Sequence, residues 1–181
     1  MIARRDLISE PYLEMQKILH AAPRGYGGRG DKWAGMVRHL IETTGATSVL
    51  DYGCGQGTLV AALAPMPGVR FSEYDPAIPL KDGPPTFADL VVCTDVLEHI
   101  EHDRLNAVLE HLRSLARRQV FVVISTKLTA KVLADGRNAH LTVKPSSWWK
   151  RKMEKAGFMV EKSPKIGQRK PEHEWVAVLT P

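Results

Sequence analysis

Four residues of the stretch SVLDYGCGQGTLVAAL, residues 48–63, have types and a spacing that could bind a ligand. Asp51 lies in an apolar run with the composition of a buried strand, and Gly53, Gly55 and Gly57 follow at every second position. Glycines at such a junction let the backbone turn sharply and approach a ligand with no Cβ atom in the way. The stretch therefore predicts a strand, a tight glycine loop and a helix, with a binding site at the loop.

The charge of Asp51 indicates which class of ligand the loop prefers. A dinucleotide-binding loop, G-x-G-x-x-G, would need a third glycine where the chain has Thr58, and a P-loop would need a Gly-Lys-Ser/Thr sequence. A carboxylate beside the loop repels a diphosphate but attracts a cation. S-adenosylmethionine carries an ammonium and a sulfonium group and no phosphate, so we expect it as the cofactor. A dehydrogenase is the weak alternative, which an absence of NAD binding would exclude.

The second predicted strand ends at another acidic residue. In VRFSEYDPA, residues 69–77, Asp75 lies where an acidic side chain can accept hydrogen bonds from both hydroxyls of a ribose. Glu73 is a rival for this role but lies inside the strand, and Asp75 could also be a turn residue before Pro76. Its combination with the glycine loop favours the binding role.

Three segments together resemble the class I S-adenosylmethionine-dependent methyltransferase family. VLDYGCGQG resembles its first motif, FSEYDPA its ribose-binding motif, and FADLVVCTDVLEHI the segment around its fourth strand. The resemblance implies that residues 51–57 hold the methionine end of the cofactor, that Asp75 holds the ribose, and that residues 94–96 line the opening for methyl transfer. The implied cofactor-binding residues are Asp51, Tyr52, Gly53, Cys54, Gly55, Gly57, Asp75, Thr94, Asp95 and Val96.

Two histidines that follow predicted strands are candidate catalytic bases. His99 lies just past the strand that ends at Thr94, and His140 lies in the loop after the strand that ends at Ser125. Imidazole titrates near neutral pH, so either side chain could accept the proton that an O or N acceptor loses. A structural, hydrogen-bonding histidine is the alternative for each.

The same region raises the question of a metal ion. Asp95, Glu98 and His99 resemble the acidic-x-x-acidic-His set that binds a divalent ion in the small-RNA 2′-O-methyltransferase family and in ubiquinone-type O-methyltransferases. His140 could complete such a site, because oxygen and imidazole ligands suit Mg²⁺, Mn²⁺ or Zn²⁺. Asp95 stands where those families usually have glutamate, however, and Leu-Glu-His recurs in members that need no metal. We therefore predict no metal ligand and keep a metal-assisted reaction as the alternative.

The acceptor is less constrained than the cofactor. The chain lacks the N/D-P-P-Y/F motif of DNA amino-methyltransferases and the Pro-Cys pair of cytosine C5 enzymes, and little of it lies beyond the predicted core, which favours a small-molecule acceptor. Residues 113–170, however, carry fifteen Lys/Arg against three Asp/Glu, so an anionic acceptor or RNA could dock there. A solvated basic face explains this region equally well, and a non-catalytic cofactor-binding module is a further alternative.

The elements that must position these residues alternate between strand and helix. Continuous apolar runs such as ADLVVC and VFVVI are typical of parallel strands covered on both faces. The pattern predicts strands at 48–52, 69–74, 88–94, 120–125, 158–160 and 174–179, and helices at 11–21, 32–43, 58–64, 103–117 and 146–156. We expect an α/β fold: a single-domain, Rossmann-like, doubly wound and mostly parallel sheet with a C-terminal antiparallel strand, and a ligand beyond the carboxyl ends of its strands.

One departure from the family concerns the segment after the second strand. Only PAIPLKDGPPT, residues 76–86, separates Asp75 from Phe87, where the family normally has a helix, a further strand and an adenine contact. We expect this unit to be shortened, the sheet to lack a strand and the adenine pocket to be partly open, with Asp82 as a candidate adenine contact. We divide the chain into residues 1–31, an N-terminal helix with a Gly-rich cover segment (PRGYGGRG), and residues 32–181, the methyltransferase domain.

The composition is that of an ordinary soluble globular protein, with 44% apolar and 25% charged residues and a net charge of +5. No apolar run is long enough to span a membrane, and no apolar signal core follows Arg4 and Arg5, so we expect a cytoplasmic protein without membrane partners. Two cysteines, Cys54 and Cys93, are too few for a disulfide framework and should be buried and reduced.

Overall fold

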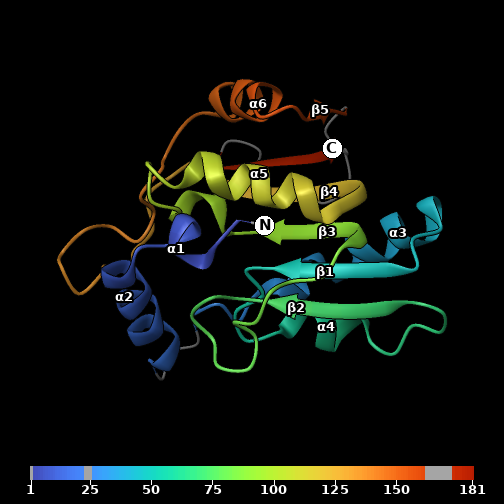
Figure 1. Cartoon of the computed structure of the whole chain (residues 1–181), viewed down its shortest axis with the longest axis horizontal. Coiled ribbons are helices and arrows are strands. Elements are labelled where there is room, and N and C mark those ends of the chain that lie inside the picture. The colour runs from blue at the N-terminus through green and yellow to red at the C-terminus, as the bar shows by residue number, and fades with distance from the viewer. Residues whose placement is uncertain (1, 23–25, 162–172) are drawn as a thin grey trace.

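The computed structural model describes residues 2–22, 26–161 and 173–181 (Figure 1). One six-stranded sheet, in the order β2-β1-β3-β4-β6-β5, forms its centre. The strands are β1 (Ser48–Tyr52), β2 (Arg70–Tyr74), β3 (Ala88–Thr94), β4 (Ala116–Ser125), β5 (Met159–Val160) and β6 (Glu174–Thr180). The helices are α1 (Arg4–Leu7), α2 (Glu10–Ala21), α3 (Ala34–Thr44), α4 (Thr58–Leu63), α5 (Leu105–Leu115) and α6 (Ser146–Lys155), with the 3-10 turns η1 (Gly30–Trp33) and η2 (Leu97–His99).

The strand pairing confirms the predicted mostly parallel sheet. β1 pairs in parallel with β2 and β3, and β3 pairs in parallel with β4. The C-terminal strand β6 runs antiparallel to β4, and the short β5 runs antiparallel to β6. All five residues of β1 are buried, including Ser48 and Asp51, and β3 is buried at five of its seven positions, as expected of parallel strands covered on both faces.

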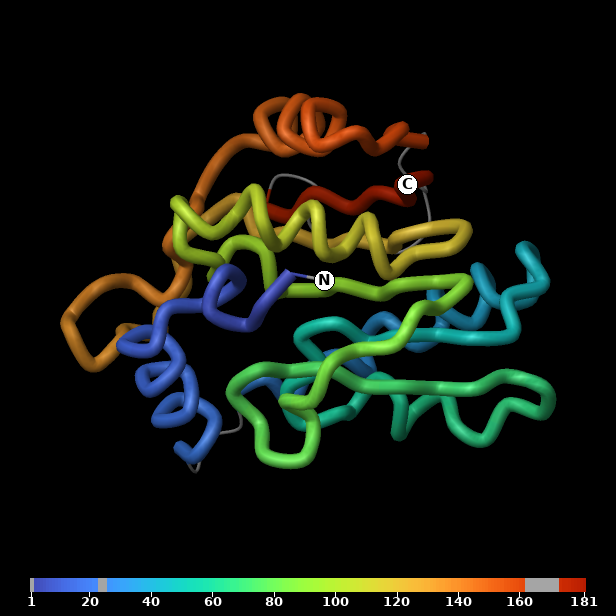
Figure 2. The backbone as a smooth tube through the Cα atoms, in the orientation of Figure 1, coloured from blue at the N-terminus to red at the C-terminus, as the bar shows by residue number. Residues whose placement is uncertain are grey.

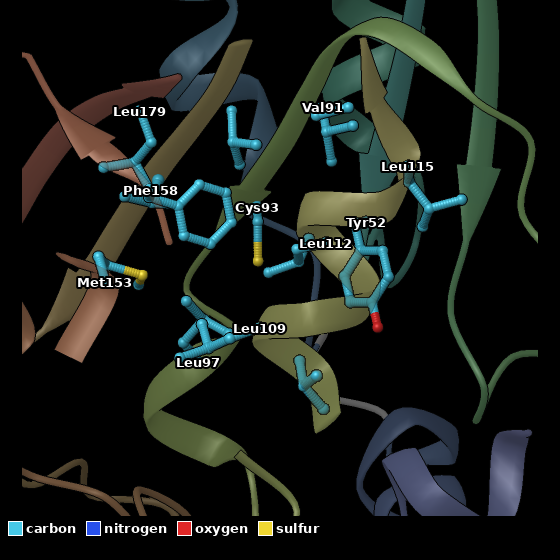
Figure 3. Close-up of a cluster of buried hydrophobic side chains, with 14 of the residues drawn as sticks. Tyr52, Val91, Cys93, Leu97, Leu109, Leu112, Leu115, Met153, Phe158 and Leu179 are labelled. Atoms are coloured by element: carbon cyan, nitrogen blue, oxygen red, sulfur yellow. The ribbon is translucent and has the colours of Figure 1, made fainter. Parts of the chain in front are cut away.

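Helices cover both faces of this sheet and create two apolar layers. On one face, α5 and α6 pack over β3, β4 and β6, with Leu109, Leu112 and Phe158 in the layer (Figure 3). Trp149 is fully buried there, so one of the two adjacent tryptophans of α6 is a packing residue. On the other face, α3 and α4 pack against the sheet. Gly45 ends α3 in a left-handed conformation with φ 65°, as its position predicts.

The structure corrects two boundaries that the sequence pattern misplaces. The helix predicted over 103–117 ends at Leu115, and β4 already begins at Ala116, four residues before the predicted strand. Ala116 pairs with Ala88 of β3, whereas Arg117 and Arg118 point to solvent, so this part of the strand has no apolar signature. The short turns α1 and η2 were not predicted, because neither is long enough to show a helical period.

The segment between β2 and β3 is short, as predicted. Residues 75–87 contain turns but neither helix nor strand, so the sheet lacks the strand that the family normally has here. Cys54 and Cys93 are buried and unpaired by any disulfide. Among the helices of the described residues, none combines the length and the apolar character of a membrane span.

Candidate functional site

A cavity of about 330 Å³ lies beyond the carboxyl ends of the parallel strands, where Figure 1 shows α2 and the loop between β4 and α6. Its walls come from the loops after β1, β2 and β3, from α1 and α2, from residues 26–30, and from the loop that contains His140. Loops that follow adjacent parallel strands meet at one edge of a sheet, which explains why residues distant in sequence line a common cavity. The lining includes these residues predicted to bind the cofactor: Asp51, Tyr52, Gly53, Cys54, Gly55, Asp75, Thr94, Asp95 and Val96.

The glycine loop adopts a conformation that side chains would prevent. Gly53, Gly55 and Gly57 have φ values of 75°, 52° and 77°, in the left-handed region that favours glycine. A Cβ atom on Gly55 would lie 2.8 Å from the Cα of Gly27, and the amide of Gln56 donates to the carbonyl of Gly27 at 3.0 Å. The glycines thus allow the loop after β1 to pack against the backbone of Gly27, and they also leave room for a ligand. Gly57 is not among the lining residues. A Cβ atom on it would meet the side chains of Glu73 and Lys81.

Asp51 is a buried acid at the inner wall of the cavity. It is 4% exposed, and burial, together with the charge of Glu73, raises its pKa from 3.8 to about 7; Lys81 acts in the opposite direction. The neighbouring thiol of Cys54 also has a raised pKa because of burial. A carboxyl group with so high a pKa lacks a tightly bound cation in the free protein, and a ligand's ammonium group would supply one.

The raised pKa of Asp51 predicts a pH-dependent affinity for the cofactor. Above pH 7 the carboxylate is charged and can pair with an ammonium group; below pH 7 it takes up a proton that binding must release. The dissociation constant of S-adenosylhomocysteine should therefore rise by about tenfold per pH unit below 7. Calorimetric titrations between pH 5.5 and 8 measure this slope. The Asp51→Asn variant should bind more weakly with a flatter profile, and an equally steep profile in that variant would assign the effect to another group.

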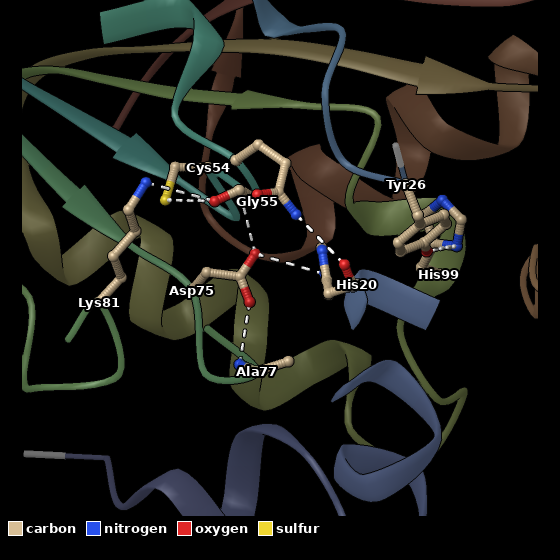
Figure 4. Close-up of polar contacts among 9 residues, drawn as sticks. His20, Tyr26, Cys54, Gly55, Asp75, Ala77, Lys81 and His99 are labelled. Atoms are coloured by element: carbon tan, nitrogen blue, oxygen red, sulfur yellow. Dashed lines mark hydrogen bonds and ion pairs between the residues drawn. The ribbon is translucent and has the colours of Figure 1, made fainter. Parts of the chain in front are cut away.

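Asp75 organises the turn after β2 and faces the cavity. Its Oδ2 accepts the backbone N–H of Gly55 at 3.0 Å, and its Oδ1 accepts the N–H of Ala77 at 2.9 Å (Figure 4). Each carboxylate oxygen keeps a free lone pair for a ligand hydroxyl. Glu73, the rival candidate, pairs instead with Lys81 at 3.2 Å. Asp82, the candidate adenine contact, is not part of the cavity lining and lies 3.9 Å from Arg4.

Helix α2 and residues 26–30 cover the cavity, and the role of α2 was missed from sequence. His20 lies 4.0 Å from Asp75, and the rings of His20 and Tyr26 meet edge to face at 4.9 Å (Figure 4). Gln16 Nε2 and His20 Nδ1 are buried and make no hydrogen bond of good geometry to described residues, although Gln16 lies near the hydroxyls of Tyr12 and Tyr26 and His20 near the backbone of Tyr26. Buried donors without partners are rare and often mark a ligand's place. Gln16 and His20 are four positions apart in the predicted helix 11–21. This spacing is the sequence signal that they share one helix face.

The cavity lining also includes the two candidate bases, His99 and His140. His99 Nδ1 donates to the carbonyl of Ala139 at 2.8 Å and lies 3.1 Å from the Tyr26 hydroxyl, while His140 Nδ1 donates to the carbonyl of Lys127 at 2.6 Å. Carbonyl groups only accept, so Nε2 of each ring carries the lone pair. The rings lie 4.7 Å apart, edge to face. Burial lowers the pKa of both, that of His99 to about 3, and both are neutral at pH 7.

Glu98 joins these histidines, whereas Asp95 does not. Glu98, His99 and His140 each offer one ligand atom, and these atoms all lie within 4.8 Å of one another. Glu98 is fully buried; its Oε1 accepts the N–H of Ser125, and its Oε2 has no partner among the described residues. Burial raises the pKa of Glu98 to about 8. The carboxylate of Asp95, the first member of the alternative metal set, pairs instead with Lys32 at 2.6 Å and is not part of this group.

Comparison with known proteins identifies methyltransferase domains as similar. A family model described as a methyltransferase domain matches residues 12–163. No curated protein matches the sequence. Among solved structures, the methyltransferase domain of bacterial CtHen1 is similar with 21% identity and a TM-score of 0.60, covering 83% of this chain and 98% of that chain.

Two structures with other acceptors in their names are also similar. Magnesium protoporphyrin IX methyltransferase from Synechocystis PCC 6803, with bound S-adenosylmethionine, has 16% identity and a TM-score of 0.58, covering 98% of this chain and 94% of that one. The 1,6-didemethyltoxoflavin-N1-methyltransferase of Burkholderia thailandensis, with bound S-adenosylhomocysteine, has 15% identity and a TM-score of 0.64, covering 96% and 90%. At these identities the likeness shows a common fold.

Proposed function

The chain belongs to the class I S-adenosylmethionine-dependent methyltransferase family, and from that premise we propose that it methylates an O or N nucleophile of a small, soluble acceptor. One observation carries the proposal: the same cavity is lined by two buried acids, Asp51 and Asp75, and by the imidazoles of His99 and His140, whose pKa values burial lowers. The names of two similar structures, a magnesium protoporphyrin IX methyltransferase and a 1,6-didemethyltoxoflavin-N1-methyltransferase, support a small acceptor.

In the proposed arrangement, the two acids bind the cofactor, and the two histidines position the acceptor and accept its proton. Asp51 and the glycine loop hold the cationic methionine end, and Asp75 holds the ribose hydroxyls. When bound, S-adenosylmethionine supplies a methyl group on an electrophilic sulfonium. The protein then mainly aligns the acceptor with that methyl group. His140 Nε2 accepts the proton that the acceptor loses, while His99, held by Ala139 and Tyr26, positions the acceptor.

Transfer of a labelled methyl group tests this function. The protein is incubated with S-adenosylmethionine labelled in the methyl group and with a cell extract separated into small molecules, RNA and protein. We expect label in the small-molecule fraction. Label confined to RNA would replace the proposed acceptor class, and its salt dependence would then show whether the basic residues 113–170 bind phosphates. Cofactor binding without transfer to any fraction would favour the non-catalytic module.

A second candidate, metal-assisted methylation, is favoured by the Glu98–His99–His140 cluster. Both histidines donate Nδ1–H to a backbone carbonyl, the outer contact that orients metal-ligating imidazoles, and Glu98 Oε2 is buried without a described partner. A divalent ion held there would polarise an acceptor hydroxyl.

Metal removal separates the two candidates. The metal-assisted candidate predicts that EDTA treatment abolishes transfer, that Mn²⁺ or Zn²⁺ restores it, and that Zn²⁺ binds the wild type at least about tenfold more tightly than the Glu98→Gln variant. The proton-transfer assignment to His140 predicts unchanged transfer by metal-stripped protein. Calorimetric titration with Zn²⁺ alone reports on the cluster independently of activity.

A further inference from the structure

Apolar side chains of the N-terminal residues line the cavity together with the turn that contains Asp75. Ala77, whose N–H donates to Asp75 at 2.9 Å, belongs to the same apolar cluster as Ile8 and Tyr12. Leu7 also lines the cavity and packs in the layer that contains Tyr74 and Val108. The walls beside the proposed ribose site therefore come from the N-terminal segment, residues 2–12, as well as from the turn after β2.

Specific hydrogen bonds hold the N-terminal segment in this place. The backbone N–H and the hydroxyl of Ser9 donate to the two carboxylate oxygens of Glu101 at 2.9 and 2.6 Å, while Ser9 also begins α2 as its N-cap. The hydroxyl of Tyr12 donates to the carbonyl of His99 at 2.6 Å, and Arg104 donates to the carbonyl of Arg5 at 3.1 Å. Figure 2 shows the segment beside α5, and Arg4 lies 3.9 Å from Asp82 in the loop after β2. It is thus a fixed part of the cavity wall.

These contacts matter because residues 75–87 contain no helix or strand that could enclose a base. Adenine is a flat ring that is joined directly to the ribose, so its subsite must lie next to Asp75 and offer apolar surface. We propose that residues 2–12 form the adenine subsite, with Leu7 and Ile8 against the base, in place of the strand–helix unit that the chain lacks. This inference rests on the proposed binding of S-adenosylmethionine at Asp51 and Asp75.

The test compares two isoleucines of the N-terminal part. Ile8→Glu places a charge on the apolar wall and should weaken the binding of 5′-methylthioadenosine, which has no amino-acid end, by at least about tenfold. Ile18→Glu makes the same change at a side chain that is 60% exposed and should leave affinity within about twofold of wild type. Ile8→Leu should retain binding. Unchanged affinity in a folded Ile8→Glu protein would overturn the inference.

Photolabelling of the wild type gives an answer even if Ile8→Glu does not fold. S-adenosylhomocysteine with an azido group on the adenine ring should crosslink to a peptide within residues 2–12. Label only in residues 76–87, or elsewhere, would overturn the inference. If the wild type binds no S-adenosylhomocysteine, the proposed function fails; if it binds but the N-terminal segment is unlabelled, only this inference fails.

Discussion

Replacing Asp75 by alanine should weaken the binding of S-adenosylhomocysteine by at least about 100-fold, equivalent to about 3 kcal/mol. Two effects combine. The variant loses the carboxylate that we assign to the ribose hydroxyls, and it leaves the N–H groups of Gly55 and Ala77 without their acceptor. The second effect loosens the glycine loop itself, so binding of the methionine end of the cofactor should also weaken. Titration calorimetry at pH 8, where Asp51 is charged, measures the loss.

Asp89 provides the matched control. Its carboxylate likewise accepts a backbone N–H, that of Thr47 at 2.9 Å, but Asp89 is not part of the cavity lining. Asp89→Ala should lower stability by about 1 kcal/mol and leave cofactor affinity unchanged. Equal affinities in wild type and Asp75→Ala would remove Asp75 from the site, whereas equal losses in both variants would indicate a general effect on folding.

Gly55→Ala should abolish measurable cofactor binding at concentrations that saturate the wild type. The added Cβ would meet the backbone of Gly27, with its Cα only 2.8 Å away, and neither segment has a flexible side chain that could yield. Gly55 also has φ 52°, which alanine adopts only with strain. The loop and the covering residues 26–30 must then separate, and the cavity between them loses its shape. Titration calorimetry and thermal melting together measure binding and stability.

Gly35→Ala is the control for this change. Gly35 lies within α3, and a Cβ atom there would meet nothing within 4 Å. Alanine should stabilise the helix by about 0.5–1 kcal/mol without affecting binding. A Gly55→Ala protein that binds as tightly as Gly35→Ala would show that the close contact between Gly27 and Gly55 is not needed for the site.

Strands that are buried on both faces could be predicted closely from sequence. β1 and β3 begin and end at the predicted residues, because their apolar runs stop at polar or glycine residues. β4 was predicted too short because Arg117 and Arg118 are exposed strand residues, and only the pairing of Ala116 with Ala88 reveals the strand there. The shortened segment after β2 was evident from its length, whereas the position of α1 against α5 depends on tertiary packing alone.

The candidate site was predictable where chemistry depends on local spacing. The glycines and the acids at strand ends are read directly from the chain, and they line or adjoin one cavity. Contacts between distant segments were not readable: nothing near Asp95 indicates its partner Lys32, sixty-three positions earlier in the chain. Likewise, Gln16 and His20 gain their place in the cavity only through the packing of α2 across the strand ends.

The central claim is that this cavity binds a cationic, phosphate-free methyl donor against Asp51. Its most direct test is calorimetric titration of the wild-type protein at pH 8 with S-adenosylmethionine and, separately, with NAD⁺. We expect one molecule of S-adenosylmethionine to bind per chain, no detectable heat from NAD⁺, and a marked loss of affinity in Asp51→Asn. Saturable binding of NAD⁺ with none of S-adenosylmethionine, or full affinity in Asp51→Asn, would contradict this account.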